Sequence, residues 1–233
     1  MTNQLILLKL QQRLDKLGSS DYANLEQWMY IEAFNKAQIE WVRRQLEGIN
    51  QTKTGPESTT TRIDDLQFLI TTKPLAPLID QGIYYSAPFP TDYLQFNRVS
   101  CMGSNDCCPS RPFQVFESIE ADRDINLADV GKQPDFDWAT TFCTVSGSQV
   151  NIYTNGQFDI PSATLTYYRI PANIEIAGVA NPITGAISGT DVLCEAADNV
   201  IEIFVEEAAQ ILAADIQNYN LSAKLRNDAN QNT

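Results

Sequence analysis

The chain contains no histidine among its 233 residues. Histidine is the commonest general base near neutral pH and the commonest metal ligand. Its absence excludes a Ser-His-Asp or Cys-His nucleophile built from this chain alone. We therefore expect a protein that is not an enzyme and that has no catalytic residues, cofactor or cofactor-binding residues.

Charged residues are also scarce, at 19% of the chain, against about 25% in ordinary globular proteins. A surface with little charge favours a subunit of a larger assembly over a free monomer. Basic residues are fewer than acidic ones, with 16 Lys and Arg against 29 Asp and Glu, which gives a net charge of −13. This balance opposes sequence-specific binding of nucleic acid, because an acidic surface repels phosphates. Solubility alone would also explain the acidity.

Long apolar runs are missing as well, since no stretch approaches the roughly 20 residues that span a bilayer. The segment "LILLKL" is interrupted by Lys9 and lacks the basic start and small-residue cleavage site of an export signal. The sequence therefore predicts no membrane association.

The cysteines number five, an odd count, in a chain without an export signal. Both facts predict reduced thiols in a cytoplasm. Cys101, Cys107 and Cys108 form a C-x5-C-C cluster. Zinc sites usually pair cysteines as CxxC or add histidine, and adjacent cysteines fit one tetrahedral ion poorly. We predict no metal site, with a metal-bound cluster as the less favoured alternative.

Close pairs of acids, such as Asp122 with Asp124 and Asp135 with Asp137, arise by chance among 29 carboxylates. None has the glycine-punctuated spacing of a calcium loop, and no glycine-rich phosphate-binding pattern is present. We assign function to none of these pairs.

Both ends of the chain have helical periodicity. Leucines from Leu5 to Leu17 predict one helix, Tyr22 to about Leu46 a longer one, and the residues after Asp198 a third. The centre reads as strand and loop, including "LQFLITT", "FQVFESI", a hairpin around Gly147, and "TLTYYRIP". The predicted fold class is α+β, with long terminal helices forming a helical-bundle core and a central β-rich insertion.

The predicted domains follow from this pattern. Residues 1–61 and 196–227 form the helical core, residues 62–195 the β-rich insertion lobe, and residues 228–233 a disordered tail. Residues 51–61 form a polar loop. That loop is either an exposed connection or an arm that becomes ordered on a partner.

The stretch "YYSAPFPTDYLQFNRVS", residues 84–100, holds five aromatic rings and two charged residues. Its prolines hold the chain extended, and a turn or short helix is expected to start at Thr91 or Asp92. We interpret it as the joint between helical core and β lobe. Its candidate packing or subunit-interface residues are Phe89, Pro90, Tyr93 and Phe96.

Four further aromatic residues are candidates for packing or for a subunit interface. Trp28 and Trp41 are expected in the core, with an intersubunit role as the alternative. Tyr167 and Tyr168 are adjacent on a predicted strand and should point to opposite faces. We expect one to be buried and the other to face a neighbour.

Three segments in this order resemble the head–tail connector proteins of tailed phages. They are "FPTDYLQFNRVS" after long N-terminal helices, a hairpin leading to "LTYYRIP", and a closing helix "VIEIFVEEAAQIL". Their wording is most similar to the ring proteins of crAss-like bacteriophages, especially the portal-proximal ring 1 adaptor. The resemblance covers most of residues 21–223.

This resemblance implies a structural virion protein with an adaptor-like fold. It implies a ring, twelve-fold by analogy with the portal, that connects the portal to the next ring or tail protein. Genome DNA would pass through the lumen without sequence-specific binding. The subunit would lie in the neck of the virion after assembly in the host cytoplasm.

Two other readings of the sequence stay open. One is a β-rich virion decoration or receptor-binding module with a helical stalk. The other, less favoured, is a carboxylate-based glycan hydrolase, which needs two acids facing each other across a cleft.

Overall fold

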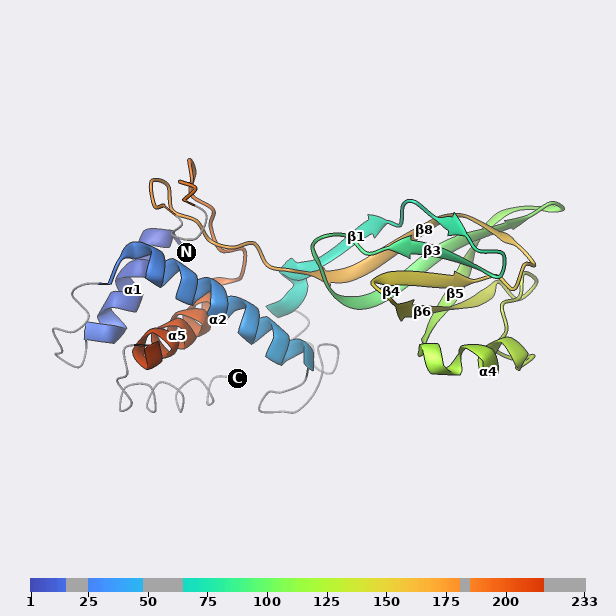
Figure 1. The fold of residues 1–233 in the computed structure, drawn as a ribbon, viewed down its shortest axis with the longest axis horizontal. Helices are drawn as coiled ribbons and strands as arrows, with labels where there is room; N and C mark the ends of the chain where they lie inside the picture. The colour runs from blue at the N-terminus through green and yellow to red at the C-terminus, as the bar shows by residue number, and fades with distance from the viewer. Residues whose placement is uncertain (16–24, 48–64, 181–184, 216–233) are drawn as a thin grey trace. The chain divides into compact units, whose positions relative to one another are not determined.

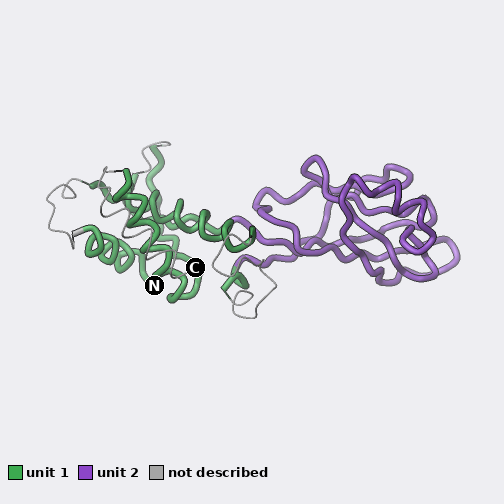
Figure 2. The backbone as a smooth tube through the Cα atoms, turned by 90° about the horizontal axis from the view of Figure 1, so that it is seen from below, with its two compact units in different colours: residues 1–68, 171–233 green, residues 69–170 purple. Residues whose placement is uncertain are grey.

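The computed structural model describes residues 1–15, 25–47, 65–180 and 185–215. The chain divides into two compact units, which Figure 2 colours separately. Residues 1–68 and 171–233 form the helical unit, and residues 69–170 form the sheet unit. The polar loop predicted at 51–61 and the tail at 228–233 lie outside the described residues.

The helical unit contains α1 (Asn3–Asp15), α2 (Gln27–Glu47) and α5 (Asp198–Asp215), which pack side by side (Figure 1). Ile6, Leu10 and Leu14 of α1 are fully buried at intervals of four residues. This spacing places them on one helix face. The apolar stripe of α1 therefore forms part of the core of this unit.

Aromatic rings fill the contact between α2 and α5. Phe204 of α5 is fully buried and meets Phe34 and Trp41 of α2 edge-on, at centroid distances of 5.8 and 5.3 Å. Edge-on contacts add stability beyond the burial of apolar area. Ion pairs flank the core, with Lys9 and Arg13 of α1 bound to Glu202 of α5.

The sheet unit is built on eight strands in the order β1-β8-β4-β5-β6-β7-β3-β2, curled into a half-barrel. Neighbouring strands are antiparallel except β5 and β6, which are parallel. The strands are β1 (Ile70–Pro74), β2 (Ile79–Asp80), β3 (Tyr84–Pro88), β4 (Tyr93–Asn105), β5 (Cys108–Ser118), β6 (Thr140–Ser146), β7 (Gln149–Tyr153) and β8 (Asp159–Arg169).

One face of this sheet carries the main apolar core of the unit. The rings of Phe113, Phe136 and Phe158 pack together, with Phe113 and Phe158 at 4.5 Å between centroids. Gly103 on β4 lies under the Phe113 ring, where a Cβ would come within 2.3 Å of Cε2. Glycine is therefore required at this point because only hydrogen fits beneath the ring.

The parallel pair β5 and β6 requires a crossover connection. Residues 119–139 supply it, through the short helices η3 (Glu120–Asp122) and α4 (Arg123–Ala128). Figure 1 shows α4 beside the sheet near β5 and β6. We call residues 119–139 the crossover segment.

The predicted fold class was wrong. The described structure is mostly the curled eight-stranded sheet with four α-helices, rather than a helical-bundle core of long terminal helices with an insertion. The main cause is residues 84–100, which were interpreted as a joint but form β3 and most of the 13-residue β4. Pro88 and Pro90 do not prevent this, because they lie at the end of β3 and in the turn before β4.

Candidate functional site

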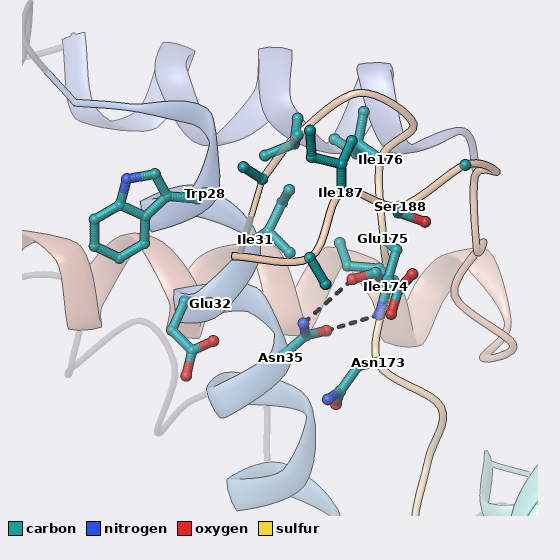
Figure 3. Close-up of a pocket in the computed structure, with 14 residues that line it drawn as sticks. Trp28, Ile31, Glu32, Asn35, Asn173, Ile174, Glu175, Ile176, Ile187 and Ser188 are labelled. Atoms are coloured by element: carbon teal, nitrogen blue, oxygen red, sulfur yellow. Dashed lines mark hydrogen bonds between the residues drawn. The ribbon is translucent and has the colours of Figure 1, made fainter. Parts of the chain in front are cut away.

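A groove in the helical unit is lined by α2 and the segment that leads to α5 (Figure 3). Its volume is about 430 Å³. Figure 3 shows Trp28 and Glu32 on the α2 side, with Ile176 and Ile187 on the facing segments. The other lining residues are Ile31, Asn35, Asn173, Ile174, Glu175, Val179, Ala180, Ala186, Ser188 and Gly189.

Amide side chains on the helices hold one wall of this groove. Asn35 of α2 accepts a hydrogen bond from the Ile174 N–H at 2.8 Å and donates to the Ile174 carbonyl at 3.3 Å. Asn3 of α1 donates to the carbonyls of Glu175 and Val192 at 2.8 and 3.0 Å. These bonds replace a strand ladder, because residues 173–180 form isolated bridges only.

The lining determines what the groove can accept. Glu32, Glu175 and Ser188 supply acceptor oxygens beside apolar surface, and the described lining residues include no lysine, arginine or cysteine. Ile187 is 66% exposed. This composition suits a bound segment that carries apolar side chains and hydrogen-bond donors.

The two tryptophans that were candidates for packing or an interface occupy different environments. Trp41 is 2% exposed and lies in the core of the helical unit. Trp28 is half-buried, borders the groove, and donates its indole N–H to Glu26 Oε2 at 2.6 Å. Of the two, only Trp28 is accessible to a partner.

In the sheet unit, several of the aromatic residues that were candidates for packing or a subunit interface meet around the turn before β4. The Phe89 and Tyr93 rings stack at 3.8 Å, and Tyr93 lies 5.9 Å from Tyr167. The Pro90 carbonyl accepts the Tyr93 N–H at 3.1 Å, which closes the turn predicted at Thr91. Phe96 is opposite Tyr167 in the β4–β8 register.

Asp92 links this turn to the sheet. Lys73 Nζ lies 2.9 Å from both carboxylate oxygens of Asp92, and Tyr167 donates its hydroxyl to Oδ1 at 2.7 Å. The hydrogen bond from Lys73 lowers the pKa of Asp92, and its partner Asp92 raises the pKa of Lys73. Burial, followed by the bond to Asp92, raises the pKa of Tyr167. All three groups have partners, so the cluster fastens the turn.

The expectation that Tyr167 and Tyr168 would divide between buried and exposed faces was wrong. They are 0% and 3% exposed. Both lie on β8, an interior strand between β1 and β4. At the level of Tyr168 the paired residues on the two neighbouring strands are Ile70 and Gln95.

The crossover segment contains residues that the sequence reasoning missed. Its exposed apolar side chains are Ile119, Ile125, Val130 and Trp138, which are 65%, 63%, 83% and 81% exposed. Scattered apolar residues are normal on a protein surface. Four lie within this one connection, and Trp138 is nearly bare, so the crossover segment is a candidate contact surface.

Trp138 is held in place by a tight loop. The Asp135 carboxylate accepts a hydrogen bond from the backbone N–H of Trp138 at 2.9 Å. The backbone N–H groups of Asp135 and Thr140 each donate to the carbonyl of the other residue. Ala139 has a positive φ of 51°, which completes the reversal. The indole is thus presented to solvent on a defined backbone. The available signal was a tryptophan that directly follows an acid, at the end of "PDFDW".

Within the part of the chain that the structure describes, no group of three or more His, Cys, Asp or Glu side chains is placed to hold a metal ion. Among these same residues, no helix has the length and apolarity to cross a bilayer.

No family model matches the chain, and the comparison with curated proteins found no match.

Proposed function

We propose that this chain is a structural subunit of a ring in the neck of a tailed phage. In this role it connects the portal to the next ring or tail protein and extends the channel for DNA. The observation that carries the proposal is the exposed apolar content of the crossover segment, with Val130 and Trp138 each more than 80% exposed. The resemblance of three sequence segments to crAss-like ring proteins is the reason for proposing a phage neck ring as the assembly.

Burial of tryptophan is a strong source of binding energy, and interface energy concentrates in such residues. In a cyclic ring each subunit uses two different surfaces, one toward each neighbour. The crossover segment would supply one of them. Six acids and two bases lie between Ile119 and Trp138, so the matching surface should combine an apolar pocket with a basic rim.

The acidic balance of the chain supports the same role. A net charge of −13 repels the phosphate backbone. A channel wall that does not hold DNA lets the genome move through it. The ring needs no catalytic group to perform this function.

The test is assembly of the purified chain, alone and with the portal protein of the same virus, followed by sedimentation velocity. The Trp138→Ser variant should weaken assembly about 30-fold, since a tryptophan at the centre of an interface is worth about 2 kcal/mol or more. Its Tm should match that of the wild type, because the indole is 81% exposed.

Ile83→Ser is the matched control. Ile83 is 46% exposed in the same unit but lies outside the crossover segment, so its variant should assemble normally. Equal assembly of the wild type and the Trp138 variant would overturn the assignment of this surface. A stable trimer would instead support a decoration or receptor-binding module.

A further inference from the structure

The β4–β5 hairpin carries a pair of adjacent, exposed thiols. Cys107 and Cys108 are exposed, whereas Cys101, Cys143 and Cys194 are buried. The two exposed sulfur atoms lie 3.3 Å apart. The Cys107 thiol also lies 3.3 Å from Asn105 Oδ1, to which it can donate a hydrogen bond.

This convergence is a consequence of the turn. Consecutive side chains in a regular strand point to opposite faces. Here Cys107 lies in the turn, and Cys108 is the first residue of β5, opposite Asn105. The register of β4 against β5 also shifts between Gly103 and Asn105. Both thiols are therefore directed to the same side of the hairpin tip.

The other three cysteines differ in reactivity. Burial raises the pKa of the Cys101 and Cys143 thiols to about 12, and burial also raises that of Cys194. Thiolate is the nucleophile in disulfide exchange, so burial lowers the reactivity of these three groups in the folded protein. The pKa of Cys108 is also raised, chiefly by its hydrogen bond with Cys107, so acidity does not distinguish the exposed pair. Access and proximity single out Cys107 and Cys108.

We propose that Cys107 and Cys108 form a reversible redox site, which a small disulfide such as oxidised glutathione converts into an intrachain disulfide. One thiol loses its proton, attacks a sulfur of the small disulfide and releases one small thiolate. The neighbouring thiol then loses its proton and attacks the mixed disulfide, releasing the second small thiolate. The protein loses two electrons and two protons, and the small disulfide becomes two thiols.

The site should be easily reduced again. Adjacent Cα atoms are about 3.8 Å apart across a trans peptide, below the usual separation of about 4.4–6.8 Å in disulfides. A bond between neighbouring residues is therefore strained, and strained disulfides have more oxidising potentials. The dithiol would persist in a reducing cytoplasm, and the disulfide would form after exposure to oxidant. This inference is independent of the proposed ring function.

In the experiment, the intact folded chain is treated with oxidised glutathione. Free thiols are alkylated before and after reduction, and the mass of the chain is measured. Trypsin releases residues 99–123 as one peptide, because Pro112 follows Arg111, and fragmentation separates Cys101 from the pair. We expect a loss of two hydrogen masses at Cys107 and Cys108, full reversal by dithiothreitol, and no covalent dimer. The Cys107→Ser and Cys108→Ser variants should instead retain one glutathione.

Cys101, Cys143 and Cys194 serve as internal controls, since they should be alkylated only after unfolding. A stable glutathione adduct on the wild-type pair, disulfide-linked dimers, or no reaction would each overturn the proposal.

Discussion

Glu207 is the clearest source of pH-dependent stability in the helical unit. It lies on α5, is 5% exposed, and forms an ion pair with Arg44 of α2. Burial raises the pKa of its carboxyl from 4.5 to about 7, assisted by the negative charges of Glu40 and Glu206 and opposed by Arg44. Desolvation therefore outweighs the ion pair.

The sign of the effect follows from proton linkage. Between pH 4.5 and about 7 the folded state holds a proton on Glu207 that the unfolded state has released. The contribution of this carboxyl is fully present below pH 4.5 and is lost as the pH rises through about 7. The shift corresponds to about 3 kcal/mol, at about 1.4 kcal/mol for each pKa unit.

Glu207→Gln isolates this contribution from those of other acids. Glutamine keeps the size of the side chain and carries no charge at any pH, while Arg44 remains 30% exposed to water. Urea unfolding at pH 5 and at pH 8.5 should show the variant gaining stability over the wild type as the pH rises, by up to about 3 kcal/mol. Glu47→Gln, an exposed change on α2, should show no such trend. A difference between variant and wild type that stays constant with pH would refute the reasoning.

Two further predictions concern packing and the groove. Gly103→Ala should destabilise the sheet unit by about 1–3 kcal/mol in urea unfolding, because its Cβ would meet the Phe113 ring at 2.3 Å. Ser104→Ala is the control. Equal losses of unfolding free energy in the two variants would argue against the close contact. Asn35→Ala leaves both backbone polar groups of Ile174 without their partner, so it should cost about 1–3 kcal/mol and speed amide hydrogen exchange at Ile174. Lys36→Ala, a change at an exposed neighbouring residue, should leave the amide exchange at Ile174 unchanged. Unaltered exchange in the Asn35→Ala variant would contradict the role given to the Asn35 side chain.

Several elements could be predicted because their signals are local. Helical periodicity indicated α2 and α5, and α5 begins at Asp198, one residue before the predicted start. The turn residues Gly147 and Ser148 indicated the hairpin that joins β6 and β7. The "TLTYYRIP" segment lies largely in β8.

The sheet as a whole could not be predicted, because its pairings connect distant segments. β8 lies between β1 and β4, and the parallel pairing of β5 with β6 depends on the crossover segment. Alternation within a strand does not specify its partner. The prolines in residues 84–100 also hid β3 and β4, since proline counts against a strand unless it falls at an edge or end.

The groove was missed for a related reason. Residues 173–179 are held against α1 and α2 by the side chains of Asn3 and Asn35. Long-range bonds between side chain and backbone leave no periodic pattern in a sequence. The exposure of Trp138 likewise depends on the tertiary fold, since most tryptophans are largely buried.

Electron microscopy of the virion neck tests the central claim most directly. Particles that contain this chain should show it as a closed ring beneath the portal, with the crossover segment covered by the neighbouring subunit and Trp138 buried. Density for the chain at the capsid surface or at the fibre tips, or a neck ring in which Trp138 remains in solvent, would contradict the account.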